Sequence, residues 1–232
     1  MTELQHTLID HNISVAGSIP EEESAAALEM AGNAAEAEKV FLEEVRLAPE
    51  SKTSWHNLGM LYVHQSRLNV ARNCFLRVHE LDEKDGFAVC RIIDLSALLK
   101  DVPSVEKWCA ILASMPNGEI AALAFKARAF TRCDRYQDAK KLILDAVKNY
   151  PREPDILIAC GDVMMVYPTV GPAMEMACRV YARAVDILAS RWDSIDRQRE
   201  IEGRLEIALQ HRQKCREALE VIAVLSEDTS SW

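Results

Sequence analysis

Very few residues of this chain have the types and spacing that catalysis or metal binding requires. His56 and His64 lie eight residues apart, more than two helical turns, so they cannot share a metal ion without further ligands. Cys90 precedes Arg91, whose guanidinium could lower the pKa of the thiol, but no His-Asp arrangement accompanies it to build a nucleophile. A Gly-rich phosphate loop, Gly-x-Ser-x-Gly and His-Glu-x-x-His are all absent from the sequence. We therefore expect a non-catalytic protein with no metal site and no cofactor.

The seven cysteines are odd in number and widely spaced, and no Cys-x-x-Cys pair occurs. A disulfide framework in a short secreted chain normally has an even count, and a zinc site has closely paired ligands. We therefore predict free thiols that pack as small buried apolar residues.

Residues 1–10 contain neither a basic residue nor the apolar segment of a secretory signal, so we expect a cytoplasmic protein.

The overall charge excludes further classes of function. The 232 residues contain 27 Lys and Arg against 36 Asp and Glu, a net charge of −9. Such a chain is a poor candidate for tracking the phosphates of a nucleic acid or for reading a membrane through a polybasic segment. Charged residues interrupt every apolar stretch, so we also expect no membrane insertion.

The elements that position these residues are predicted to be helices nearly throughout. Gly and Pro number only eight each, and apolar residues recur at intervals of three and four, as at Leu142, Ile143 and Ala146. Each such segment is an amphipathic helix with one buried stripe. Proline residues and short polar turns separate the segments, so neighbouring helices form antiparallel pairs.

An internal period organises these pairs. Ala37 and Ala71 are 34 residues apart, Ala139 follows after two further periods, and each is followed four residues later by Phe41, Phe75 or Ile143. An interval of this size is typical of a solenoid of helical hairpins, in which no single unit can bury its apolar face alone.

The unit at residues 52–85 carries the most specific motif. It reads Trp55-x2-Leu58-Gly59-x2-Tyr62, followed by Ala71 and Phe75. This pattern resembles the tetratricopeptide repeat, except that Glu83 stands where the closing Pro is expected. The resemblance implies an all-α, right-handed superhelical solenoid of about six antiparallel helix pairs, in which the motif residues are packing residues.

The period divides the chain into three regions. We expect an N-terminal arm or cap at residues 1–17, repeats within 18–193, and a divergent helical hairpin at 194–232 that caps the solenoid. The predicted repeats are 18–51, 52–85, 86–119, 120–153 and 154–190. Two prolines and a glycine place an insertion at 167–172, which is either a contact loop or a tolerated surface insertion.

The resemblance also implies where a partner would bind. The first helix of each repeat lines a concave surface, so the side chains off its packing stripe face a partner. These predicted partner-binding residues are His56, Asn57, Met60, His64, Phe87, Arg91, Asp94, Phe125, Arg128, Arg132 and Asp162. The arginines suit a carboxylate and the aromatic residues suit apolar anchoring, as a peptide or helix requires. Alternatively, some arginines pair only with Asp94 and Asp162 on neighbouring helices.

One known binding mode of the family is largely missing. Some tetratricopeptide domains hold the acidic C-terminal tails of heat-shock chaperones with a clamp of Lys and Asn on successive first helices. Here Asn57 could serve as the central Asn and Arg91 stands where an Arg or Lys is wanted, but the first helix of repeat 18–51 has no Lys or Asn at the matching positions, and Phe87 stands where a Lys is needed. We therefore do not expect a heat-shock co-chaperone.

We expect a protein–protein interaction scaffold or adaptor within a multiprotein complex. The alternative is a chaperone that shields a segment of a secreted or assembling subunit, which would need a more apolar binding surface.

The acidic charge is concentrated at one end of the chain. Residues 1–51 contain eleven Asp and Glu against two Lys and Arg, a balance of −9, whereas residues 52–232 contain twenty-five of each and are neutral. A basic partner at the first repeat would account for this acidic end, although solubility alone also could.

Overall fold

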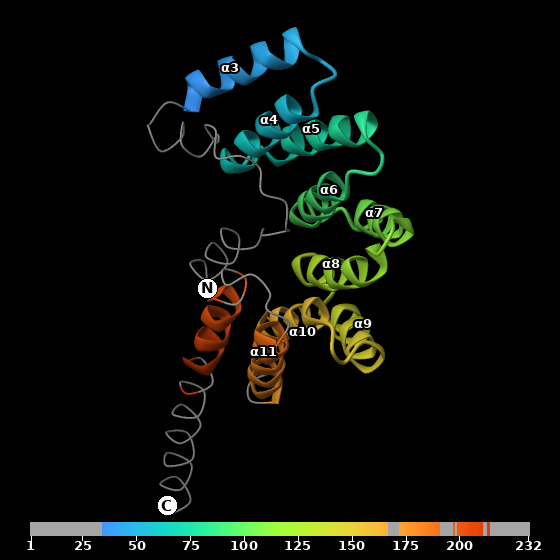
Figure 1. Ribbon diagram of the computed structural model, residues 1–232, viewed down its shortest axis with the longest axis vertical. Coiled ribbons are helices and arrows are strands. Elements are labelled where there is room, and N and C mark those ends of the chain that lie inside the picture. The colour runs from blue at the N-terminus through green and yellow to red at the C-terminus, as the bar shows by residue number, and fades with distance from the viewer. Residues whose placement is uncertain (1–33, 167–171, 191–196, 198, 211–212, 214–232) are drawn as a thin grey trace, which may run out of the picture. The chain divides into compact units, whose positions relative to one another are not determined.

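The computed structural model describes residues 34–166, 172–190, 197, 199–210 and 213. Regular secondary structure in these residues is entirely helical, which confirms the predicted all-α class (Figure 1). The helices are α3 (Ala34–Leu47), α4 (Lys52–His64), α5 (Leu68–Leu81), α6 (Gly86–Leu98), α7 (Val102–Ser114), α8 (Gly118–Arg132), α9 (Tyr136–Asn149), α10 (Pro154–Val166) and α11 (Pro172–Ser190), with residues 199–210 also helical. The predicted arm at 1–17, the insertion at 167–171 and most of the hairpin at 194–232 lie outside the described residues.

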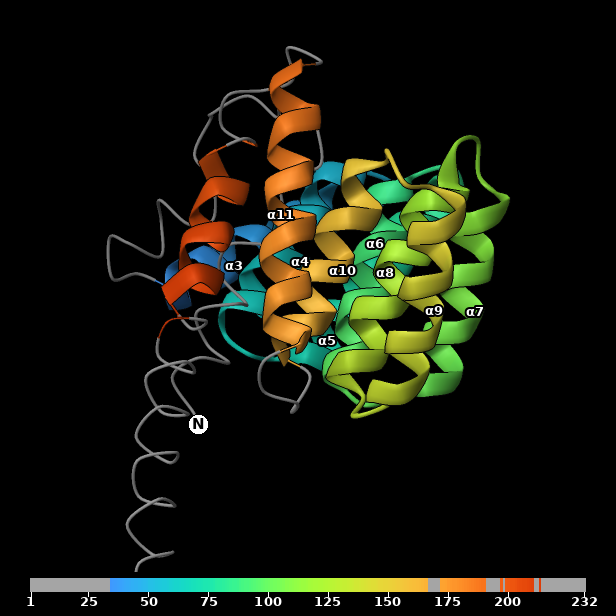
Figure 2. The same cartoon turned by 90° about the horizontal axis from the view of Figure 1, so that it is seen from below.

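The chain divides into two compact units at the turn between α8 and α9. We call the described helices α3 to α8 the N-terminal unit, and α9 to α11 with residues 197–213 the C-terminal unit. In the N-terminal unit, α4 packs against α5 and α6 against α7 as antiparallel pairs, and α6 also contacts α8 (Figure 1). In the C-terminal unit, α10 contacts both α9 and α11, and Figure 2 shows α10 and α11 side by side. Each unit is thus built from successive helices that pack side by side.

Side-chain caps start the first helices and α7 at defined residues. The hydroxyl of Ser51 accepts a hydrogen bond from the backbone N–H of Ser54 at 3.3 Å, and the Asp85 carboxylate accepts one from Ala88 at 3.0 Å. Asp101 begins α7 in the same way, accepting from the N–H of Ser104 at 3.2 Å. These oxygens satisfy N–H groups that have no partner within the helix, so Ser51, Asp85 and Asp101 determine where α4, α6 and α7 begin, whereas α5 and α8 have no side-chain cap.

The turns inside the hairpins repeat with the period of the sequence. Ser66, Lys100 and Asp134 are 34 residues apart, and each has a left-handed backbone with φ of 58°, 59° and 62°. In each turn the N–H of the next residue bonds to a carbonyl five residues earlier, as from Arg67 to Tyr62 at 2.8 Å. This is the Schellman motif, which ends one helix and allows the next to begin almost at once.

The motif residues form the core between the paired helices. Leu58, Tyr62, Ala71 and Phe75 retain at most 4% of their exposed area. Trp55 is less buried than the others, and its indole Nε1 donates to the carbonyl of Pro49 at 2.8 Å. The packing roles that the repeat motif implies are therefore confirmed for the buried members of this set.

Two equivalent glycines lie against aromatic rings of the paired helix. A Cβ at Gly59 would lie 3.0 Å from the ring of Phe75, and a Cβ at Gly161, three periods later, would lie 2.4 Å from the ring of Tyr181. A side chain at Gly161 would overlap the aromatic ring unless α10 and α11 separated. Glycine is therefore required there by packing, with an aromatic ring filling the space against the backbone.

Candidate partner-binding face

The structure places the predicted partner-binding residues on first helices in both units. Ten of them lie on α4, α6 and α8 of the N-terminal unit, and Asp162 lies on α10 of the C-terminal unit. We use "first-helix face" for the ten side chains of the N-terminal unit, which are His56, Asn57, Met60, His64, Phe87, Arg91, Asp94, Phe125, Arg128 and Arg132. Asn57 and Met60 are half-buried, and His64 is exposed at the end of α4.

An aromatic and cationic cluster joins α4 to α6. The ring of His56 stacks on the ring of Phe87 with centroids 4.8 Å apart and planes 24° apart. The guanidinium carbon of Arg91, one turn further along α6, lies 4.7 Å from the centroid of the same Phe87 ring. This geometry is a cation–π contact, so Phe87 holds the guanidinium while leaving its N–H groups to other partners. We call these three side chains the His56–Phe87–Arg91 cluster.

Arg91 is a buried charge without a counter-ion. Its side chain retains only 6% exposure, it forms no hydrogen bond or ion pair with the described residues, and its Nε is fully buried. Burial outweighs the attraction of Asp94 and lowers the pKa of the Arg91 guanidinium to about 10. Nearly all buried polar atoms in proteins have a hydrogen-bond partner, so the buried Nε of Arg91, which has none among the described residues, is an exception.

Arg132 differs from Arg91 because it has an internal partner. Its Nη1 donates to Oδ1 of Asp94 at 2.6 Å, joining α8 to α6, and the two side chains are 28% and 23% exposed. The alternative in which arginines pair between neighbouring first helices is therefore correct for Arg132. The short, half-buried pair anchors α8 on α6 more firmly than an exposed ion pair would.

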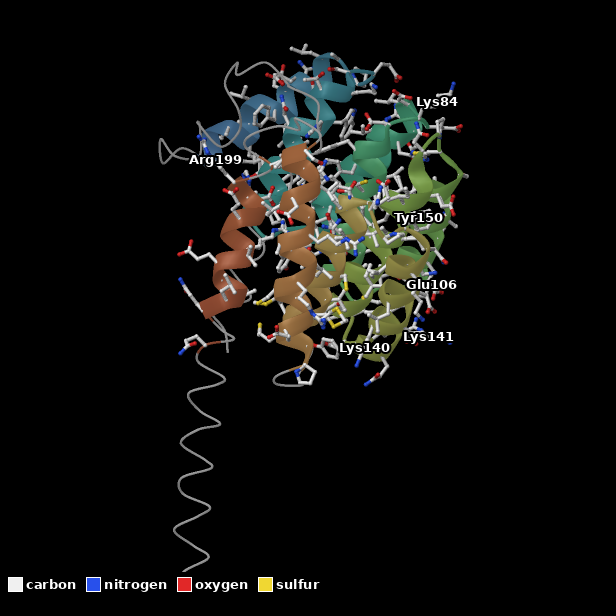
Figure 3. The ribbon with its side chains drawn as sticks, turned by 60° about the horizontal axis from the view of Figure 1, so that its bottom comes forward. Lys84, Glu106, Lys140, Lys141, Tyr150 and Arg199 are labelled. Atoms are coloured by element: carbon white, nitrogen blue, oxygen red, sulfur yellow. The ribbon has the colours of Figure 1, made fainter. Side chains whose placement is uncertain are left out.

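Ion pairs on the second helices are more exposed than the Arg132–Asp94 pair. Glu106, at the outer surface of α7 in Figure 3, accepts from Arg135 at 3.3 Å, and both side chains are more than a third exposed. Lys84 also extends outward, from the turn between α5 and α6 (Figure 3). Such surface pairs contribute little to stability because water competes for both charges.

Phe125 and Arg128 extend the pattern of the cluster onto α8. The guanidinium carbon of Arg128 lies 4.8 Å from the centroid of the Phe125 ring, and both side chains are half-buried. Arginine therefore lies over phenylalanine on two first helices that contact each other, α6 and α8. The face offers aromatic surface and guanidinium groups together, a combination that is common where proteins bind one another.

Asp162 serves the interior of the C-terminal unit. Its carboxylate accepts from the hydroxyl of Tyr181 at 2.7 Å and from Nη1 of Arg204 at 2.8 and 2.9 Å, and Arg204 in turn donates to Glu200 at 2.6 Å. The side chains of Asp162 and Arg204 are each only 12% exposed. Arg204 and Glu200 are not among the residues predicted from the sequence. The sequence does carry a signal for Arg204, because it follows Asp162 by about one repeat, as Arg132 follows Asp94.

The cysteine expectation needs one correction. The described cysteines are free thiols, but the pKa of Cys90 is raised to about 12, chiefly by burial and then by Asp94, against weaker lowering by Arg128 and Arg91. The expectation that Arg91 could lower the pKa of the Cys90 thiol was therefore wrong for the net shift, because desolvation of a thiolate outweighs a nearby cation. Burial also raises the pKa of Cys109 and Cys160 to about 12, as expected of thiols that pack in a core.

His56 is held in its neutral form. Burial and then the charge of Arg91 lower the pKa of the His56 imidazole, against a smaller opposing effect of Asp85. The imidazole therefore behaves near neutral pH as an uncharged ring stacked on Phe87. Within the described ranges no three His, Cys, Asp or Glu residues come together as metal ligands, and no helix is long and apolar enough to cross a membrane.

Comparison with known proteins bears on the fold. The sequence matches no protein-family model, and it matches no curated protein either. Its structure is similar to that of a tetratricopeptide repeat protein from Parabacteroides merdae, with a TM-score of 0.56 and 12% identity over 84% of this chain and 80% of that one. It is also similar to PilW, a widely conserved type IV pilus biogenesis factor, with a TM-score of 0.50 and 11% identity over 85% of this chain and 89% of that one. The chain therefore has the tetratricopeptide-repeat fold that its sequence motif predicts.

Proposed function

We propose that this protein is a non-catalytic scaffold or adaptor that binds a peptide or helix of a protein partner on the first-helix face, within a multiprotein complex. The observation that carries the proposal is Arg91, which is 6% exposed and forms no ion pair or hydrogen bond with the residues that the structure describes. A partner carboxylate would supply the missing counter-ion.

The surroundings of Arg91 suit this role. Phe87 fixes the guanidinium in place, so little side-chain entropy is lost when a carboxylate binds to it. A pair of N–H groups on one guanidinium can bind both oxygens of a carboxylate, which gives direction as well as affinity. Phe87 and Phe125 add apolar surface of the kind that anchors peptide side chains.

The architecture supports binding rather than catalysis. Helices that pack in series present a long surface that is already ordered, so binding orders the partner more than the scaffold. The thiols of Cys90 and Cys109 are kept protonated by burial, which removes two potential nucleophiles. A scaffold in the cytoplasm would use these residues as packing elements only.

Affinity purification of the full chain from its native cell, followed by mass spectrometry, tests the proposal. We expect Arg91→Met to lose the partner that the unaltered chain captures, whereas the control Arg77→Met should retain it, because Arg77 on α5 forms only surface pairs with Glu50 and Glu80. Helicity measured by circular dichroism should be the same in all three proteins. Equal capture by Arg91→Met would place the binding surface elsewhere.

A chaperone that shields an apolar segment is the less favoured function, because the first-helix face carries a buried charge and an ion pair between α6 and α8.

We also propose that a basic partner docks near α3, where Glu43, Glu44 and Glu50 are exposed. Such binding should weaken between low and high salt.

A further inference from the structure

The His56–Phe87–Arg91 cluster has features that restrict what kind of carboxylate it can take. The arginine on α8 that faces α6, Arg132, already has Asp94 as its counter-ion at 2.6 Å. Arg91 has no such partner among the described side chains. The cluster therefore presents one guanidinium in need of one carboxylate, rather than several cations in a row.

Two groups close to Arg91 are held uncharged. Burial keeps the imidazole of His56 neutral, by lowering its pKa, and it keeps the thiol of Cys90 protonated, by raising its pKa to about 12. Phe87 contributes an aromatic ring that contacts both His56 and Arg91. A ligand group that enters beside the guanidinium thus meets aromatic and apolar atoms.

Two acids also act on the cluster. Asp94 interacts with Arg91 through space, and Asp85, at the start of α6, interacts in the same way with His56. A second carboxylate on the ligand would be repelled by these two acids, while gaining no second guanidinium within the cluster. This arrangement selects against acidic runs by electrostatic repulsion, one of the ordinary sources of specificity.

We propose that the His56–Phe87–Arg91 cluster recognises a single carboxylate placed next to an aromatic or large apolar side chain, and that it rejects acidic clusters. This inference rests on the proposed function, because it specifies the partner chemistry at the same face. The carboxylate can come from the C-terminus of a partner chain or from an Asp or Glu side chain beside an aromatic residue.

Ligand-observed NMR titrations of the full chain with four small probes test the inference. N-acetylphenylalanine carries an α-carboxylate beside an aromatic ring, and N-acetyl-Asp-Phe amide carries a side-chain carboxylate beside one. N-acetylphenylalanine amide lacks the charge, and N-acetyl-Asp-Asp amide has two carboxylates and no ring. We expect at least one of the first two probes to bind about tenfold or more tightly than the last two, and the stronger of the two identifies the source of the carboxylate.

The same titrations on variants locate the site. Arg91→Met should lose about tenfold in affinity for the preferred probe, Arg91→Lys should keep part of it, and Arg77→Met should match the unaltered chain. Equal binding of the amide, tighter binding of the Asp-Asp probe, no binding of either aromatic carboxylate, or full affinity in Arg91→Met would each overturn the inference.

The two proposals can fail separately. If no aromatic carboxylate binds but Arg91→Met still loses its cellular partner, the ligand chemistry inferred for the cluster is wrong and the scaffold role stands. If the probes bind at Arg91 but Arg91→Met captures the same partner as the unaltered chain, the cluster binds aromatic carboxylates and the partner-binding proposal for this face is wrong.

Discussion

The N-terminal and C-terminal units use the same contact between first helices with different results. In each unit an Asp on one first helix pairs with an Arg about one repeat later, Asp94 with Arg132 and Asp162 with Arg204. The carboxylate of Asp162 also accepts from Tyr181, so its hydrogen bonds are made within the unit. In the N-terminal unit, Arg91 adds a guanidinium for which the described residues supply no carboxylate. Asp162 and Arg204 thus pair within their own unit, whereas Arg91 forms no ion pair with the described residues.

The equivalent glycines give the largest expected difference between the units. Gly161→Ala should lower the free energy of unfolding by about 3 kcal/mol, because the new Cβ meets the Tyr181 ring at 2.4 Å while the hydroxyl of that ring is held by Asp162. Gly59→Ala should cost about 1 kcal/mol, because at 3.0 Å the ring of Phe75 needs to move only slightly. Urea denaturation monitored by circular dichroism measures both values.

Gly203 provides the control for this pair. It lies in the helical segment 199–210 with no atom within 4 Å of an added Cβ, so Gly203→Ala should stabilise the protein by about 0.5–1 kcal/mol through helix propensity. Equal effects of Gly59→Ala and Gly161→Ala would mean that the two helix pairs are equally close in solution.

The buried ion pair of the C-terminal unit should be the next most sensitive feature. Arg204→Ala should lower stability by about 2 kcal/mol, because it leaves the buried Asp162 carboxylate with Tyr181 but without its cation. Hydrogen exchange should show faster opening of residues 199–210. Arg199→Ala, at an exposed position labelled in Figure 3, is the matched control and should exchange like the unaltered chain.

Replacing Arg91 should change the stability of the protein in the opposite direction to replacing Arg204. Replacing it with Met keeps most of the apolar stem and removes a buried charge without a counter-ion, so stability should rise by about 1 kcal/mol while partner binding is lost. Denaturation and affinity purification of the same preparation check both halves of this expectation. A fall in stability like that of Arg204→Ala would show that Arg91 is a structural residue.

The hairpin turns should show a smaller effect. Ser66 has a φ of 58°, a conformation that costs an ordinary residue more than it costs glycine, so Ser66→Gly should stabilise the N-terminal unit by about 0.5–1 kcal/mol. Lys100→Gly should gain less, because Lys100 also pairs with Asp134 at 2.7 Å. Thermal denaturation of both variants compares the two turns, and no gain in Ser66→Gly would indicate that its turn is relaxed in solution.

The stability of the folded protein should depend on pH through His56 of the His56–Phe87–Arg91 cluster. The pKa of His56 is lowered from 6.5 in the folded state, so the unfolded chain binds more protons there and stability is lost as the pH falls below about 6.5. The His56→Phe variant keeps an aromatic ring and cannot titrate. It should therefore lose less stability than the unaltered chain between pH 7.5 and 5.5, as measured by urea denaturation. Equal losses in the two proteins would show that His56 does not cause the loss of stability at low pH.

Local pattern was sufficient for much of the fold. The 34-residue period predicts which residues are buried, and Ala71 and Phe75 have no exposed area. Pro103 lies in the first turn of α7, where a proline needs no N–H partner and its fixed φ suits the helix. These features depend on residues close together in the chain, where helical periodicity directly relates sequence to burial. The right-handed superhelix, its number of pairs and the role of 167–172 stay predictions.

By itself, the sequence determined the helical pairs, their packing residues and the helices that carry the candidate face. Only the tertiary structure decided which charges on that face are neutralised. Asp94 and Arg132 are 38 residues apart and Asp162 and Arg204 are 42 apart, so their pairing depends on how helices from successive repeats are aligned. The pKa of the Cys90 thiol also depends on the tertiary structure, because burial by neighbouring helices raises it more than the adjacent Arg91 lowers it. Charge and solvation are set by everything that surrounds a group in space, and chain neighbours are only a small part of those surroundings.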